Sequence, residues 1–251
     1  MKLSATIITL NEERNIRRCI DSLLNVADEI IVLDSNSTDK TEAICNEYPM
    51  VQFHKKDWEG YSASKNHLNS LAKYDYILSL DADEALDNEL ESSILELKKM
   101  ASPQLYSLNR MTNYCGKWIK HSGWYPDVKT RIFPKEGSYW DGEFVHEELV
   151  FPEDLKIIQL NGHLSHYSYY DYLDHRARAD KYSTLTAMKM HKNGKNASML
   201  KPYFSGLARF VGMYFVKAGF LDGWSGFKIA QISAQSNVFK YQELRRLNKA
   251  K

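Results

Sequence analysis

Residues 76–84 read YILSLDADE, an apolar run that ends in the carboxylates Asp81, Asp83 and Glu84. The continuous apolar run predicts a buried strand over residues 76–81. In an open parallel sheet, ligands bind beyond the carboxyl ends of the strands, where these carboxylates would lie. A solvated surface turn has the same local pattern. The rest of the sequence therefore has to decide between an acidic turn and a cation site.

The surrounding sequence predicts strands that alternate with helices. Short runs of apolar, β-branched residues predict strands at residues 5–10, 29–34 and 51–55. Apolar residues at helical spacing predict the helices at residues 11–24, 37–48, 62–73 and 87–100. Asn11 is available as the N-cap of the first helix. This alternation predicts βαβ units, and hence an α/β fold with a mostly parallel central sheet.

The pattern changes beyond Pro103. Residues 105–118 and 128–135 are typical of antiparallel strands, joined by the loop HSGWYPD at residues 121–127. Residues 169–192 and the chain from Lys201 onward have helical spacing again. The sequence therefore predicts a C-terminal helical extension beside the sheet.

The composition excludes several classes of protein. The 251 residues carry a formal net charge of +1, which argues against a nucleic-acid binder, since such proteins have a basic excess. Cys19, Cys45 and Cys115 lack CxxC spacing, so we expect a reducing, cytoplasmic setting without disulfides or a zinc site. The N-terminus MKLSATIITLNEE is interpreted as a strand rather than a signal peptide. No apolar stretch reaches about 18 residues, so no membrane-spanning helix is expected.

Polar residues follow three of the predicted strands. Thr9, Asn11 and Glu12 follow the first strand, and residues 34–39, DSNSTD, follow the second. Asp81 and the residues after it follow the fourth. Because the carboxyl ends of parallel strands meet at one edge of a sheet, we expect these groups to face one crevice.

Two other kinds of acidic site fail on spacing. A calcium loop of EF-hand type that begins at Asp81 needs glycine at the position of Leu86 and glutamate at the position of Ser92, and this chain has neither. A phosphatase of the haloacid dehalogenase type expects Thr or Val where this chain has Ala85. Neither interpretation explains the stretch.

Four ordered motifs resemble family 2 glycosyltransferases of the GT-A fold. They are TIITLNEERNIRRCIDSLL (6–24), EIIVLDSNSTDKT (29–41), SKNHL (64–68) and ILSLDADE (77–84). Later segments resemble the branch that contains lipopolysaccharide-core β-glucosyltransferases: RIFPKEGSYWDGEFVHEEL (131–149), HYSYYDY (166–172) and KAGFLDGWSGF (217–227). The resemblance implies a catalytic domain over residues 1–168, with a nucleotide-binding half (1–102) and an acceptor half (103–168), and a helical region over 169–251.

The resemblance also implies which residues bind a UDP-sugar. In the family, Asp34 recognises the base, and an acceptor-only carboxylate suits the imide N–H of uracil. Lys65 meets the diphosphate as a point charge. The common pattern of the family has glycine at the position that Asn36 occupies in this chain. Asparagine tolerates the positive backbone φ expected at that position. The full implied donor set is Thr9, Asn11, Glu12, Asp34, Ser35, Lys65, Asn66, Asp81 and Asp83.

A divalent cation, Mg²⁺ or Mn²⁺, is the implied cofactor. In related enzymes the residue at Asp83 coordinates the metal, and the residue at Asp81 holds the ribose or a metal-bound water. His146 is a candidate ligand or orienting group, and His166 is a second candidate for the third ligand. The cation would stabilise the leaving nucleoside diphosphate as a Lewis acid.

An inverting transfer needs a base that removes the proton of the acceptor hydroxyl. The candidates are Asp141, Glu143, Glu147 and Glu148. The resemblance favours Glu147, with Asp141 as the alternative. Trp124, Tyr125 and Trp140 either stack on sugar rings or pack in the core.

The segment from residue 200 to 228 is apolar on more than one face, with interspersed basic residues. It is either a core helix or a membrane-surface seat, and the resemblance favours the latter. The expected activity is transfer of a sugar, most simply glucose, from a UDP-sugar to a lipopolysaccharide-core or other lipid-linked acceptor, by a peripheral protein on the inner face of the cytoplasmic membrane. Alternatives are another cell-envelope polysaccharide acceptor, a non-catalytic nucleotide-sugar-binding protein, or a nucleotidyltransferase. The last would need a basic, glycine-rich loop where TLNEERN stands. The sequence leaves the oligomeric state open.

Overall fold

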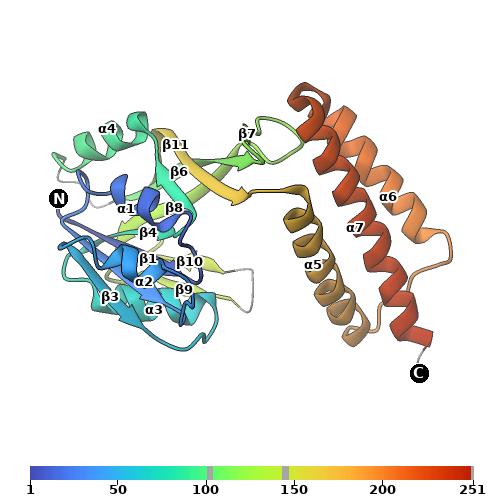
Figure 1. The fold of residues 1–251 in the computed structure, drawn as a ribbon, viewed down its shortest axis with the longest axis horizontal. Coiled ribbons are helices and arrows are strands. Elements are labelled where there is room, and N and C mark those ends of the chain that lie inside the picture. The colour runs from blue at the N-terminus through green and yellow to red at the C-terminus, as the bar shows by residue number, and fades with distance from the viewer. Residues whose placement is uncertain (101–103, 143–146, 250–251) are drawn as a thin grey trace. The chain divides into compact units, whose positions relative to one another are not determined.

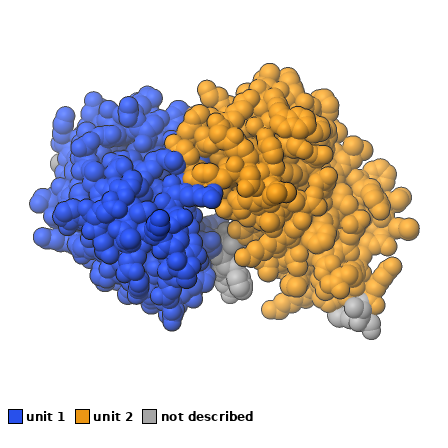
Figure 2. All heavy atoms as spheres, in the orientation of Figure 1, with its two compact units in different colours: residues 1–110, 127–166 blue, residues 111–126, 167–251 orange. Residues whose placement is uncertain are grey.

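The computed structural model describes residues 1–100, 104–142 and 147–249, and Figure 1 traces them. The chain divides into two compact units, coloured in Figure 2. Unit 1 comprises residues 1–110 and 127–166, and unit 2 comprises residues 111–126 and 167–251. The functional division at residue 168 stays a prediction.

In the described part of the chain the main sheet has nine strands, eight of them in the order β3-β2-β1-β4-β8-β6-β11-β5, with β7 paired to β6. The strands are β1 (Leu3–Thr9), β2 (Glu29–Asp34), β3 (Val51–Lys55), β4 (Tyr76–Asp81), β5 (Glu84–Leu86), β6 (Leu105–Tyr114), β7 (Lys117–Trp118), β8 (Asp127–Pro134) and β11 (Ile157–Tyr169). Strands β3, β2, β1 and β4 pair in parallel, and β8 joins β4 and β6 in antiparallel fashion. The predicted parallel strands and the change to antiparallel pairing beyond Pro103 are confirmed.

Among its described residues, unit 1 contains the helices α1 (Ile16–Asp21), α2 (Thr41–Cys45), α3 (Tyr61–Leu71) and α4 (Asn88–Leu97). Alternate residues of β2 enter two different apolar clusters. Ile30 and Val32 pack with α1, whereas Ile31 and Leu33 pack with Leu68 of α3. The strands β1, β2 and β4 are buried almost throughout, which explains their continuous apolar runs, whereas β3 at the sheet edge is only partly buried.

The register of the parallel strands brings their polar ends together. Thr9 at the end of β1 lies opposite Asp34 at the end of β2. On the other side of β1, Ile8 lies opposite Asp81 at the end of β4. A second, two-stranded sheet pairs β9 (Tyr139–Asp141) with β10 (Glu148–Val150).

The proposed N-cap at Asn11 is wrong. The first helix begins only at Ile16, after a turn in which the Asn15 backbone N–H donates to the Glu12 carbonyl, 2.9 Å away. Asn11 instead has a positive φ of 54°, and its side-chain oxygen accepts from the backbone N–H of Thr38 at 2.8 Å. A long-range hydrogen bond thus replaces the local cap. The positive φ expected at residue 36 is confirmed at 63°.

Unit 2 contains the helices α5 (Tyr172–Lys192), α6 (Lys201–Val211) and α7 (Gly223–Lys249). A π-helical turn (Gly212–Val216) and a 3₁₀ turn (Gly219–Asp222) connect α6 to α7. Helix α7 packs against both α5 and α6, as Figure 1 shows. The predicted C-terminal helical extension is confirmed. Among the helices the structure describes, none combines the length and apolarity needed to cross a bilayer.

An aromatic cluster stabilises the start of the helical part of unit 2. The hydroxyl of Tyr114 lies 2.7 Å from Nδ1 of His175, and the rings of Trp124, Tyr169 and Tyr172 pack around Tyr114. Burial lowers the pKa of His175 from 6.5 to about 4. Trp124 therefore contributes to packing within unit 2.

Candidate active site

The ends of β1 and β2 place Thr9 and Asp34 side by side, and both residues are buried. The Asp34 carboxylate accepts hydrogen bonds from the backbone N–H of Ser37, at 2.8 Å, and from the Ser37 hydroxyl. The Thr9 hydroxyl is buried and has no hydrogen-bond partner among the described residues. An unpaired buried hydroxyl is costly unless a ligand satisfies it, so this edge has the character of a binding site.

The loops after β1 and β2 hold each other in place. The backbone N–H of Ser35 donates to the Thr9 carbonyl at 2.9 Å, and the Glu12 backbone N–H donates to the Thr41 hydroxyl at 2.9 Å. The Glu12 carboxylate accepts from the side chain of Asn15 at 2.7 Å. Asn11, Glu12 and Ser35, all predicted from the sequence to bind the donor, thus lie on two mutually supporting loops.

Lys65 on α3 connects two of the predicted carboxylates. Its Nζ lies 3.2 Å from Oδ1 of Asp81 and 3.1 Å from Oε1 of Glu147. The Lys65 side chain is only 1% exposed and lies over the ring of Trp140, with Nζ 4.7 Å from the ring centroid. A buried ammonium needs such partners, because burying an unpaired charge is very unfavourable. Lys65 and Glu147 therefore meet although they are 82 positions apart in the sequence.

Asp81 is held by a second cation as well. Nη2 of Arg131, on β8, lies 2.9 Å from Oδ2 of Asp81. Burial by itself would raise the pKa of Asp81, but the Lys65 ammonium and the Arg131 guanidinium lower it well below its ordinary value. Asp81 is therefore a carboxylate with its charge already balanced by the protein.

Glu84, to which the sequence assigned no catalytic role, is wholly buried beneath the acidic turn. Its Oε1 lies 2.7 Å from Nη2 of Arg131 and 3.2 Å from Nη1 of Arg110, and its Oε2 accepts from the Asp81 backbone N–H at 3.1 Å. Arg110 also pairs with Asp127 at 2.7 Å. This network fixes the shape of the turn that carries Asp81 and Asp83. Sequence reasoning missed both arginines, although a charged residue inside the apolar run RIF indicates a buried carboxylate partner.

Asp83 faces a different partner. Its Oδ2 lies 3.2 Å from Nε2 of His166 on β11, and both side chains are largely buried. The strand pairing accounts for this contact, because His166 lies opposite Glu84 in the β11–β5 ladder. No group of three or more His, Cys, Asp or Glu side chains placed to hold a metal ion occurs in the described part of the chain.

The remaining predicted residues lie around β9. The side-chain amide of Asn66 pairs with the backbone of Trp140, donating to its carbonyl and accepting from its N–H, both at 2.8 Å. Asp141 is exposed at the end of β9, opposite Glu148 of β10. Asn66 thus ties α3 to β9, and its role toward the donor stays a prediction. The candidates Glu143 and His146 lie outside the described residues.

Residues 4–145 match the family described as Glycosyl transferase family 2. This stretch is more than half of the chain and contains the ends of β1, β2 and β4. The chain belongs to glycosyltransferase family 2.

Relatives of similar length support the family assignment. An uncharacterized glycosyltransferase of Rickettsia bellii is 31% identical over 268 residues, covering 98% of this chain and 87% of the relative. The lipopolysaccharide core biosynthesis glycosyltransferase LpsC of Rhizobium meliloti is 31% identical over 244 residues, covering 93% of this chain and 88% of LpsC. Among solved structures, S. aureus TarS 1-349 in complex with UDP-GlcNAc has a TM-score of 0.49 at 17% identity, covering 98% of this chain and 92% of TarS 1-349.

The glycosyltransferase has the mixed α/β architecture that the resemblance implied, with a GT-A fold and a C-terminal helical region. Its family segment ends at residue 145. Glu147 and His166 lie beyond that segment, yet the structure places them against Lys65 and Asp83. The candidate site of the glycosyltransferase therefore combines the ends of the parallel strands β1, β2 and β4 with residues from later in unit 1.

Proposed function

We propose that this glycosyltransferase transfers a hexose from a UDP-sugar to a hydroxyl group of a saccharide acceptor, with inversion at the anomeric carbon. The observation that carries the proposal is the Lys65 ammonium held between Asp81 and Glu147 at the end of β4. It brings together a cation for the diphosphate and a carboxylate able to accept a proton. Both lie beyond the carboxyl ends of parallel strands, where ligands of such sheets bind.

The donor nucleoside occupies the ends of β1 and β2. The Asp34 carboxylate accepts a hydrogen bond from the imide N–H of uracil. The Thr9 hydroxyl, which has no partner among the described residues, gains a hydrogen bond with the nucleoside. Because the Asp34 carboxylate is buried under Ser37, donor binding displaces the Ser37 contacts. Lys65 then exchanges part of its pairing with Glu147 for the donor diphosphate.

The residues present fit a divalent cation at Asp83 and His166, where a carboxylate and an imidazole already approach within 3.2 Å. A cation bound there supplies Lewis-acid stabilisation of the leaving UDP. The mixed oxygen and nitrogen set favours Mn²⁺ over Mg²⁺, which prefers oxygen alone. Asp81 is already paired with Lys65 and Arg131, so we assign it to positioning the turn and the donor rather than to direct metal ligation.

Glu147 is the proposed base. Its carboxylate takes the proton of the acceptor hydroxyl as that oxygen forms a bond to the anomeric carbon. The bond from the anomeric carbon to the diphosphate oxygen breaks at the same time, and UDP leaves with the bonding electron pair. Release of Lys65 toward the diphosphate frees Glu147 for this role, which couples donor binding to base activity. Asp141, exposed at the end of β9, is the alternative base.

A lipopolysaccharide-core or other lipid-linked saccharide is the proposed acceptor, and glucose is the proposed sugar. Similarity to LpsC, a lipopolysaccharide core biosynthesis glycosyltransferase, supports this acceptor class. A lipid-linked acceptor made inside the cell places the enzyme on the inner face of the cytoplasmic membrane. Another cell-envelope polysaccharide is the alternative acceptor.

The test is a release assay with a panel of nucleotide sugars. The purified chain is incubated with UDP-glucose, UDP-galactose, UDP-N-acetylglucosamine and GDP-mannose, with Mn²⁺, Mg²⁺ or EDTA, and the free nucleotide is measured. We expect release from a UDP-sugar that requires a divalent cation and increases with a core-saccharide acceptor. Release from GDP-mannose alone, or turnover unaffected by EDTA, contradicts the proposal.

A further inference from the structure

Unit 2 carries a strong local excess of positive charge. Between residues 181 and 242 the chain contains nine lysine and arginine residues but one acidic residue, Asp222, although the whole chain has a net charge of only +1. Asp222 is 3% exposed, so it adds almost no negative charge to the surface. A cationic surface of this kind attracts an anionic partner.

One face of α6 and the turn after it exposes apolar side chains instead of burying them. Leu200, Phe204, Leu207, Val211 and Phe215 recur at helical spacing and are each between 40% and 65% exposed. The opposite side of α6 contacts α7, where a Cβ at Gly206 would lie 2.4 Å from Val238. The apolar face is therefore directed away from the core of unit 2, which removes the interpretation of α6 as a core helix.

The turns between α6 and α7 continue this exposed surface. Phe215, Val216, Phe220, Leu221 and Trp224, which we name the apolar tip, are between 48% and 79% exposed. Large aromatic and aliphatic groups on a surface are unfavourable in water unless they bury against a partner. Aromatic side chains beside basic residues are typical of helices that lie in a membrane interface.

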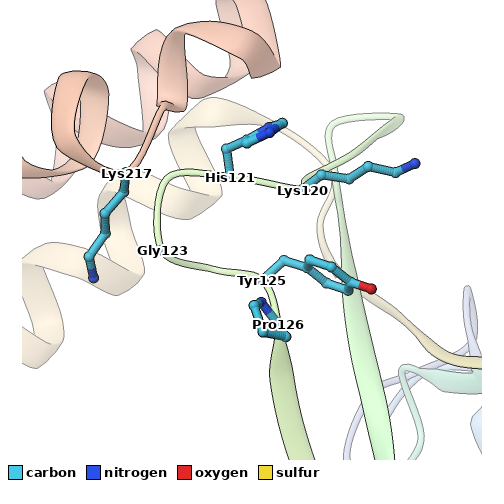
Figure 3. Close-up of a pocket in the computed structure, with 6 residues that line it drawn as sticks. All are labelled: Lys120, His121, Gly123, Tyr125, Pro126 and Lys217. Carbon is cyan, nitrogen blue, oxygen red and sulfur yellow. The ribbon is translucent and has the colours of Figure 1, made fainter.

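A cavity of about 440 Å³ lies next to the apolar tip in unit 2. We name it the basic pocket, and Figure 3 shows its lining residues Lys120, His121, Gly123, Tyr125, Pro126 and Lys217. Lys217 links the two features, since it immediately follows Val216 of the apolar tip. Within the described residues, neither the Lys120 nor the Lys217 ammonium forms an ion pair. Two such cations beside one cavity suit a phosphate group.

The basic pocket is built rather than incidental. The buried carboxylate of Asp222 accepts from the backbone N–H groups of Lys120, at 3.2 Å, and His121, at 3.0 Å, and it contacts Nδ1 of His121 at 3.0 Å. Gly123 has a φ of +74°, and a Cβ there would lie 2.5 Å from the Lys217 side chain. The loop at residues 120–123 is thus fixed against the α6–α7 connection so that Lys217 can lie across it.

We infer that the apolar tip and the exposed face of α6 insert into the interface of an anionic bilayer, and that the basic pocket binds a lipid headgroup phosphate. The inference rests on the proposed function in one respect, because a lipid-linked acceptor is reached at a membrane surface. Charge complementarity selects the bilayer over a second copy of this chain. Two copies facing each other through this surface would oppose like charges, which is unfavourable.

The test is flotation of the full-length chain with vesicles that contain no saccharide and no nucleotide sugar. We expect binding to phosphatidylcholine vesicles containing phosphatidylglycerol, and at least about ten-fold weaker binding to phosphatidylcholine alone or in high salt. The double variant Lys120→Glu/Lys217→Glu should weaken binding to the anionic vesicles by at least about ten-fold. The emission of Trp224, obtained by subtracting the fluorescence spectrum of the Trp224→Phe variant from that of the wild type, should shift to shorter wavelength when the chain binds vesicles.

Matched variants keep the outcome interpretable. Phe220→Ser/Leu221→Ser should abolish flotation, whereas Ile157→Ser, at an exposed apolar position of unit 1, and Lys99→Glu should leave it unchanged. Thermal unfolding confirms that each variant is folded. Equal binding to neutral vesicles, unchanged binding of the Lys120→Glu/Lys217→Glu variant, or a dimer in sedimentation that the Phe220→Ser/Leu221→Ser variant loses, would overturn the inference.

The release assay separates this inference from the proposed function. Nucleotide release in solution does not require the membrane surface, so the basic-pocket variants should retain it. If the wild-type chain fails to float with anionic vesicles while its nucleotide release is intact, the membrane inference alone is defeated. Flotation without release from any UDP-sugar defeats the proposed function alone.

Discussion

Nζ of Lys65 lies 3.1 Å from Oε1 of Glu147, although the two residues are 82 positions apart in the chain. The same ammonium lies 3.2 Å from Oδ1 of Asp81. One buried cation thereby joins the residue proposed to act as the base to the turn proposed to hold the donor.

Replacement of Lys65 by methionine should raise the KM for the UDP-sugar and lower kcat, because the diphosphate loses the cation that binds it and stabilises it as it leaves. It should also destabilise the fold by about 3 kcal/mol, since two carboxylates lose their buried partner. Steady-state kinetics and urea unfolding measure both effects. Lys73→Met, at an exposed position just after α3, serves as the control and should change neither quantity appreciably. A normal KM in Lys65→Met would refute the role assigned to this ammonium.

Glu147→Gln should retain UDP binding and lose turnover by about 10²- to 10⁴-fold, the range typical of a general base. Calorimetric titration with UDP and the release assay separate these two properties. Asp141→Asn and Glu148→Gln are the matched comparisons on β9 and β10. If Asp141→Asn loses turnover while Glu147→Gln retains it, the base is Asp141.

Asp83→Asn and His166→Asn should each weaken Mn²⁺ binding by at least about ten-fold, the scale expected on loss of one metal-site group. Electron paramagnetic resonance of Mn²⁺ in the presence of UDP gives a readout that does not depend on turnover. His163→Asn, on the same strand, should bind Mn²⁺ like the wild type. Unchanged Mn²⁺ binding in both Asp83→Asn and His166→Asn would place the metal elsewhere.

Glu84→Gln should lower the free energy of unfolding by about 3 to 5 kcal/mol, because it leaves two buried arginines with a neutral partner. Urea unfolding measures the change, and the exposed Glu96→Gln should alter stability by less than about 0.5 kcal/mol. The double variant Glu84→Gln/Arg131→Met should lose less free energy of unfolding than the sum of the losses in the two single variants, because the two residues share one network. Strict additivity would show that the pair does not interact.

Stability should fall as the pH decreases from 6.5 toward 4. Burial holds the pKa of His175 near 4, so the unfolded chain takes up a proton in this range before the folded chain does. The loss amounts to about 3 kcal/mol at the acidic end, at about 1.4 kcal/mol per pKa unit. His175→Phe should flatten this part of the stability curve, whereas His54→Phe should retain it. A curve that is equally steep in His175→Phe would contradict the assignment.

The sequence was sufficient to predict that the polar ends of the parallel strands, where the candidate site is assigned, meet at one edge of the sheet. The apolar runs before Asp34 and Asp81 identified parallel strands, and the carboxyl ends of such strands meet at one edge. That reasoning needs only local periodicity and a general topological rule. It therefore placed both carboxylates at one edge of the sheet without knowledge of any long-range contact.

The parts of the site that depend on long-range contacts were not predictable in this way. Glu84 meets Arg110 and Arg131 from 26 and 47 positions away, and only the antiparallel addition of β8 and β6 to the sheet brings them together. Asn11 failed as a cap for the same reason, since a hydrogen bond to Thr38 determines its conformation. Local pattern specifies the strands, whereas strand pairing specifies which charges meet.

The most direct test of the central claim is the ratio of UDP to CDP affinity, measured by calorimetric titration in the presence of Mn²⁺. Cytosine lacks the imide N–H from which Asp34 is proposed to accept a hydrogen bond. A hydrogen bond to a charged group contributes about 1.5 to 3 kcal/mol. The wild type should therefore bind UDP about 10- to 100-fold more tightly than CDP, and Asp34→Asn should lose this preference. Equal affinity for the two nucleotides in the wild type, or an unchanged preference in Asp34→Asn, would contradict the account.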